Sequence, residues 1–129
     1  MLIDVYFQTI HDTIEASRAV HSSSVTYDKR TSYVGFIKGT ILLLDGSTLH
    51  FREFVDVETA IERYTYAYQY QRGDDLVFRY DNTEHHRKLK LPTFPHHKHD
   101  GSETSVIAAR APALAAVLEE VEILLNIPL

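Results

Sequence analysis

The sequence predicts an α+β fold: an N-terminal helix, an antiparallel meander of about five strands, a histidine-rich loop, and a C-terminal amphipathic helix packed on the sheet. Apolar residues recur with helical spacing at both ends of the chain and alternate in its middle, where short glycine turns separate the strand-like runs. Such a run of strands bounded by helices is typical of this class. At 129 residues, the chain has the length of a single domain, 1–129.

The first helix is predicted by one apolar stripe with steps of four, three and four, formed by Ile3, Phe7, Ile10 and Ile14. The serine-rich residues 21–24 stop this pattern, and residues 24–30 alternate weakly. Strands are expected near 34–44 and 48–55, joined by Asp45-Gly46-Ser47, and near 61–71 and 75–82, joined around Gly73. The last helix covers 114–125, after Pro112 and before Asn126.

Composition and the absence of common motifs exclude several classes of protein and of chemical site. With 44% apolar and 24% charged residues, the chain is globular rather than disordered. It contains no cysteine, which excludes disulfides, thiolate nucleophiles and cysteine-based zinc sites and fits a reducing compartment. It carries no basic leader at its start and no apolar run of membrane-spanning length, so we expect a cytoplasmic protein without a membrane partner. The common signatures of hydrolases, nucleotide-binding proteins and zinc proteases are missing.

The charge is segregated along the chain. The formal net charge is −5, yet between Arg79 and His99 five lysines and arginines face only two acids, Asp81 and Glu84. A locally basic surface is therefore compatible with an acidic protein, and such a surface suits a phosphate-bearing partner.

Alternation in the strands places several polar residues. Tyr64, Tyr66, Tyr68 and Tyr70 share a face at period two and are expected to pack in the core, with Arg63 on the opposite face. Arg79 and Asp81 share a face of their strand and are expected to pair with each other or with Arg63 across the sheet. Glu53 falls on an otherwise apolar face, where a charge needs a partner such as Arg63 or Arg79.

The segment "RYDNTEHHRKLKLPTFPHHKHDG", residues 79–101, is the main candidate for chemistry. Three interpretations remain open from its residues alone. The segment is a solvated connector, or its imidazoles act as general acid and base in metal-independent RNA cleavage, or they bind a borderline cation such as Zn²⁺. Two observations argue against a cation site. The ligand spacing is unfamiliar, and Lys98 lies between the best-spaced histidines, His97 and His99.

"IKGTILLLDGSTLHFREFVD", "IERYTYAYQYQ", "RYDNTEHH" and "FPHHKHDG", in this order and before an amphipathic helix, resemble the TumE family of small toxins from prokaryotic toxin–antitoxin systems. The resemblance runs from about Gly35 to Leu125. It implies a toxin and a small DNA-binding antitoxin as its partner, without implying a reaction. The matching positions are Arg79, Tyr80, Asp81, Asn82, His85, His86, Pro95, His96, His97, Lys98 and His99.

Because the resemblance and the chemistry select the same residues, we expect a ribonuclease without metal or other cofactor. His97 and His99 are the expected acid and base, and Asp81 or Glu53 the residue that orients an imidazole. Arg79 and Lys98 are expected to contact phosphate, with further substrate contacts from His85, His86, His96 and Arg63. The alternative is a non-enzymatic domain that binds a protein or a metal through the same loop. The oligomeric state stays open, a homodimer included.

Overall fold

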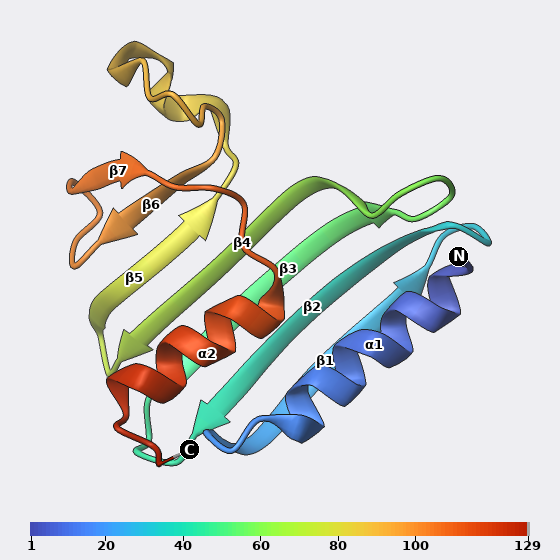
Figure 1. Ribbon diagram of the computed structural model, residues 1–129, viewed down its shortest axis with the longest axis horizontal. Coiled ribbons are helices and arrows are strands. Elements are labelled where there is room, and N and C mark those ends of the chain that lie inside the picture. Colours follow the sequence, from blue (N-terminus) through green and yellow to red (C-terminus); the bar gives the residue numbers. More distant parts are fainter. Residues whose placement is uncertain (129) are drawn as a thin grey trace.

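The computed structural model describes residues 1–128, and for residues 85, 87 and 88 it describes the backbone alone. The α+β prediction is confirmed: a helix at each end of the chain flanks a seven-stranded antiparallel sheet (Figure 1). The elements are α1 (Ile3–Ala16), β1 (Val20–Lys29), β2 (Val34–Leu43), β3 (Thr48–Asp56), β4 (Glu62–Arg72), β5 (Asp75–Asp81), the 3₁₀ segment η1 (Glu84–Leu89), β6 (His97–Asp100), β7 (Val106–Ala108) and α2 (Leu114–Leu124).

The sheet is a continuous meander in which each strand pairs with the next one in sequence, from β1 to β7. Two of its turns depend on glycine, since Gly46 between β2 and β3 has φ 86° and Gly73 between β4 and β5 has φ 58°. Glycine adopts positive φ without the steric cost that a Cβ atom would bring. The sequence therefore located both hairpins correctly.

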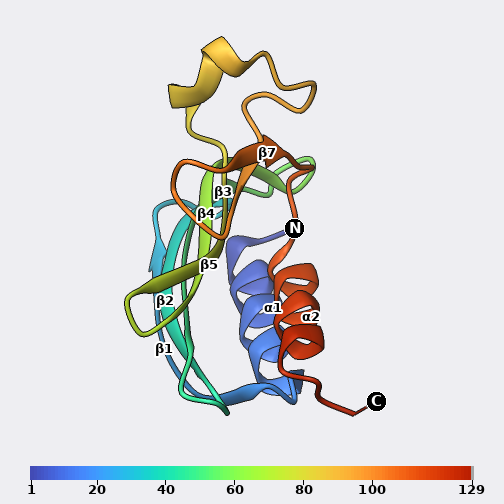
Figure 2. The same ribbon diagram turned by 90° about the vertical axis from the view of Figure 1, so that its left-hand side faces the viewer.

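Both helices cover the same face of the sheet (Figure 2). On α1 the buried residues are Tyr6 and three members of the predicted stripe, Ile3, Ile10 and Ile14, whereas the fourth member, Phe7, is partly buried against the core. On α2 the buried residues are Leu114, Val117, Leu118 and Val121. They pack with inward residues of β2, β3 and β4 into one core. Burial of such side chains, worth about 1.5–3 kcal/mol each, is what holds the helices on the sheet.

One glycine allows α1 to approach β2 closely. A Cβ atom at Gly35 would lie 2.5 Å from the Phe7 ring and 2.8 Å from Ile3. The missing side chain thus lets the first two turns of α1 rest directly on the strand. None of the helices in residues 1–128 is long and apolar enough to cross a membrane.

The histidine-rich segment between β5 and α2 was expected to be a loop, but part of it forms strands. Residues 97–100 and 106–108 form β6 and β7 and extend the sheet beyond β5. These strands were missed because they are only four and three residues long, and β6 is rich in histidine and lysine rather than β-branched residues. The connection between β5 and β6 projects beyond the ends of both strands (Figures 1 and 2).

The tyrosine row also departs from the prediction. The register of β3 with β4 shifts between Phe54 and Val55, which leaves Tyr64 unpaired as a bulge. Tyr66, Tyr68 and Tyr70 point into the core, whereas Tyr64 is 48% exposed. The extra residue reverses the alternation, so Arg63 points to the helix side together with Tyr66 and Tyr68, contrary to the expectation.

Candidate functional site

The pairing of β5 with β6 brings four sequence-predicted residues together. In this register Arg79 lies opposite His99 and Asp81 lies opposite His97. Opposed residues of an antiparallel pair point to the same side of the sheet, and residues two apart on one strand share that side. All four side chains therefore gather on the face away from the helices, near the outer end of the sheet.

Asp81 is the centre of this group and is only 2% exposed. Its Oδ1 accepts hydrogen bonds from the backbone N–H and the hydroxyl of Thr83, at 3.0 and 2.9 Å, and its Oδ2 accepts one from Arg79 Nε at 2.8 Å. Burial alone would raise the pKa of Asp81. The bonds from Thr83 and Arg79 and the proximity of His97 outweigh burial and hold the pKa below its usual value. The carboxylate is therefore ionised at neutral pH.

His97 and His99 present the same ring atom to this carboxylate. Nε2 of His97 lies 2.9 Å from Oδ1 of Asp81, and Nε2 of His99 lies 3.6 Å from Oδ2. Their other nitrogens are held by the backbone: Nδ1 of His97 is 2.9 Å from the carbonyl oxygen of Pro95, and Nδ1 of His99 is 2.9 Å from that of Glu103. Both rings are buried, at 1% and 5% exposure.

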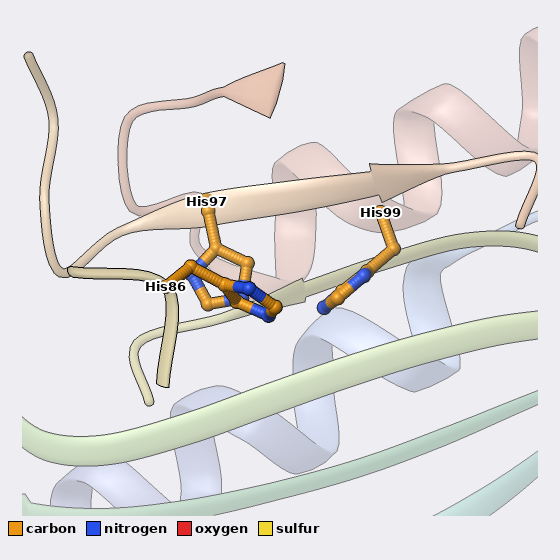
Figure 3. Close-up of side chains that lie close together, drawn as sticks. All are labelled: His86, His97 and His99. Carbon is orange, nitrogen blue, oxygen red and sulfur yellow. The ribbon is translucent and has the colours of Figure 1, made fainter. Parts of the chain in front are cut away.

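His86 completes the group from η1. Its ring centroid lies 4.8 Å from that of His97 and 5.3 Å from that of His99, and all three rings meet edge to face. Figure 3 shows the three rings turned toward one another. One nitrogen from each ring lies within 4.8 Å of the others. We call His86, His97, His99 and Asp81 the histidine cluster.

A groove adjoins the histidine cluster on the same face of the sheet. It has a volume of about 170 Å³, and its polar lining includes Lys38 of β2, His50 and Arg52 of β3, Gln69 of β4 and Arg79 of β5. Arg79 belongs to both features, since its Nη1 donates to Gln69 Oε1 at 2.8 Å while its Nε donates to Asp81. We call this feature the basic groove, because three of these five side chains are cationic and none is acidic.

The structure places Lys98 away from the cluster. As the residue between His97 and His99 on a strand, it points to the helix side, where Nζ lies 2.8 Å from Glu120 of α2 and about 5 Å from the Phe78 and Tyr80 rings. Burial lowers the pKa of Lys98, but the bonds to Glu120 and Tyr80 raise it more, so the net shift is upward. Its contacts are those of a residue that ties α2 to the sheet.

Glu53 and Arg63 also lie on the helix side, in a separate polar network. Glu53 is 1% exposed and accepts hydrogen bonds from the hydroxyls of Tyr6 and Tyr68, the latter at 2.6 Å. Arg63 donates to the Tyr68 hydroxyl at 2.9 Å and to the carbonyl of Pro112. Two tyrosine hydroxyls, rather than the expected arginine, are therefore the hydrogen-bond donors to Glu53. Arg63 is linked to Glu53 through the hydroxyl of Tyr68.

His96 and His85 are the other predicted substrate contacts. His96 stacks on Tyr66, with 2.9 Å between the Tyr66 hydroxyl and His96 Nδ1, and burial together with the charges of Arg63 and His97 lowers the pKa of His96. It points away from the cluster. The side chain of His85 lies outside the described residues.

Lys38, His50, Arg52 and Gln69 were missed as site residues. The one signal that could have found them is strand alternation, which puts them on the face opposite the apolar side chains. Nothing in the sequence showed that this face has no helix over it, or that β5 would carry Arg79 to the same groove.

The sequence profile of the family described as toxin TumE matches residues 10–125 of the chain. The match includes every element from β1 to α2, and with them the cluster and the groove. Comparison with curated proteins found no match. Comparison with solved structures found none either.

Proposed function

This chain belongs to the TumE family of toxins, and from that premise we propose that it is the toxin of a type II toxin–antitoxin pair. In this proposal it works in the cytoplasm, is held inactive by a small DNA-binding antitoxin, and stops growth by cleaving RNA at the histidine cluster.

The basic groove is the observation that carries the RNA part of the proposal. Lys38, Arg52 and Arg79 come from three different strands and line one groove, whose lining contains no acidic residue. Lysine and arginine side chains supply most of the affinity for a nucleic acid backbone through its phosphates. The groove leads to Asp81 and the imidazoles through Arg79, so a strand held by its phosphates would have one phosphodiester beside the cluster.

Proton transfer by His97 and His99 is the metal-independent form of this proposal. One imidazole removes the proton of the RNA 2′-hydroxyl, the other protonates the leaving oxygen, and Arg79 stabilises the charge on the phosphate. The role requires Nε2 of each ring to reach the substrate. Because Nε2 of His97 is buried beneath its neighbours, the segment that carries His86 would have to open when RNA binds.

Cleavage of a labelled single-stranded RNA by the purified chain tests the proposal. We expect cleavage by the wild type and a rate lower by roughly 10² to 10⁴ in His99→Ala, the contribution of one positioned acid or base. Lys29→Ala, on an exposed residue paired with Asp4, is the matched control. A wild-type chain that arrests growth when expressed without antitoxin but cleaves no RNA would favour the alternative, in which the toxin acts by binding a protein partner.

A chelator separates two roles for the imidazoles within this experiment. Cleavage that persists in chelator supports direct proton transfer by the imidazoles. Cleavage that stops in chelator and returns with added Zn²⁺ shows that the imidazoles act through a metal.

A further inference from the structure

The two buried imidazoles of β6 have a fixed tautomer. A carbonyl oxygen only accepts hydrogen bonds, so Nδ1 of His97, held by Pro95, and Nδ1 of His99, held by Glu103, both carry the hydrogen. In a neutral imidazole, the other nitrogen then has a lone pair and no hydrogen. In the neutral form of each ring, Nε2 is therefore the nitrogen whose lone pair is available to a metal ion, and it lies within the cluster.

Both Nε2 atoms lie next to the Asp81 carboxylate. Nε2 of His97 is 2.9 Å from Asp81, yet it is buried and makes no hydrogen bond of acceptable geometry. A buried nitrogen this close to an ionised carboxylate, with no aligned hydrogen bond, needs a cation between the two groups, and a proton or a metal ion can fill that role.

We propose that His86, His97, His99 and Asp81 form a binding site for one divalent transition-metal ion such as Zn²⁺. Imidazole nitrogens and a carboxylate oxygen are ligands that this class of metal prefers. On a tetrahedral Zn²⁺ with bonds of about 2.0–2.1 Å, ligand atoms lie about 3.3 Å apart. The 3.6 Å from His99 Nε2 to Oδ2 of Asp81 is close to this value, and one nitrogen from each of the three rings lies within 4.8 Å of the others.

The surrounding contacts are those of a supported metal site. A metal-ligating histidine usually donates its second nitrogen to a carbonyl or carboxylate, as His97 and His99 do here, and ligating carboxylates are themselves hydrogen-bonded. Thr83 donates two hydrogen bonds to Oδ1 of Asp81. Oδ2 accepts one bond from Arg79, and its second lone pair is the one left for a metal.

The position of Lys98 removes the main objection from the sequence. A lysine between two ligands repels a dication only if it points the same way. Here strand alternation turns Lys98 to the helix side and pairs it with Glu120, while His97 and His99 stay on the other side.

A bound metal would link two parts of the chain. Three of its ligands lie on adjacent strands, β5 and β6, and His86 lies on η1, in the connection between them. The metal would fix that connection against the end of the basic groove. The inference concerns binding and does not rest on the ribonuclease proposal, so its test uses no activity measurement.

The full chain, stripped with chelator and dialysed, is titrated with ZnCl₂ by calorimetry and with CoCl₂ by visible absorption. We expect one equivalent of each and the intense Co²⁺ bands of four-coordinate geometry. His86→Ala, at a half-buried residue of η1, and His99→Ala should each weaken Zn²⁺ binding by at least about 100-fold, the upper range for removal of a supporting residue. His96→Ala is the matched control, because this neighbouring imidazole points to the helix side.

Thermal unfolding supplies an independent readout. Zn²⁺ should raise the melting temperature of the wild type and of His96→Ala, and leave that of His86→Ala unchanged. The inference is overturned if the folded wild type binds less than one equivalent of both metals, or if His96→Ala loses binding as far as His86→Ala does.

Discussion

Asp81 and His97 face each other across β5 and β6 with 2.9 Å between Oδ1 and Nε2, and at 2% and 1% exposure they are among the most buried polar side chains of the described chain. The two atoms are close without being aligned for a hydrogen bond. The surroundings of this pair, of the basic groove and of the buried tyrosines decide how substitutions and pH should affect the protein.

Asp81→Ala should lower the free energy of unfolding by about 2–4 kcal/mol in chelator, because it leaves Arg79, Thr83 and the cluster without their common acceptor in a buried place. Urea denaturation measures this. Asp28→Ala removes an exposed ion pair with Arg30 and should cost less than about 1 kcal/mol. Equal losses in both variants would show that Asp81 is not the centre of the cluster.

Arg52→Glu should weaken binding of single-stranded RNA and lower the slope of log affinity against log salt by about 0.7 for each phosphate that the variant no longer neutralises. Arg52 lines the basic groove from β3 and is exposed, so the substitution leaves the core intact. Fluorescence anisotropy at several salt concentrations gives the slope. Lys29→Glu makes the same charge change elsewhere, and an identical slope for the two variants would remove the groove from RNA binding.

Glu53→Gln should destabilise the fold by about 1–3 kcal/mol, because the neutral amide replaces a carboxylate that accepts from the Tyr6 and Tyr68 hydroxyls and offers Arg63 a nearby counter-charge. Urea denaturation checks the value. A variant as stable as the wild type would mean that the tyrosine hydroxyls find other acceptors when the charge is removed.

The fold should lose stability at high pH. Burial raises the pKa of Tyr66 to about 12 from 10.0, against the opposing charge of Arg63, and burial and Glu53 raise the pKa of Tyr68 as well. The folded state therefore holds these protons more tightly than the unfolded chain. Their stabilising contribution is complete below about pH 10 and declines as the pH rises toward 12.

Urea midpoints measured between about pH 9 and 11 test this dependence. Tyr66→Phe should flatten the decline, whatever its effect at neutral pH. A wild-type midpoint that stays constant over the range would contradict the burial of these hydroxyls.

The main elements could be read from the sequence because each depends on local pattern. The stripe from Ile3 to Ile14 placed α1, and the glycines at 46 and 73 placed two hairpins, since helix amphipathicity and positive φ are properties of neighbouring residues. The bulge at Tyr64 could not be predicted from local pattern. One unpaired residue leaves no mark on composition, yet it moved Arg63 to the opposite side of the sheet.

The sequence by itself selected Arg79, Asp81, His97 and His99, because clustered imidazoles and charges are visible in any conformation. Only the tertiary structure decided that β6 pairs with β5, which brings these four together, and that Lys98 belongs to the helix side. The physical reason is that a strand turns successive side chains to opposite faces. Which residues share a site is therefore set by the register between strands, and that register is a long-range property which four residues of β6 do not encode alone.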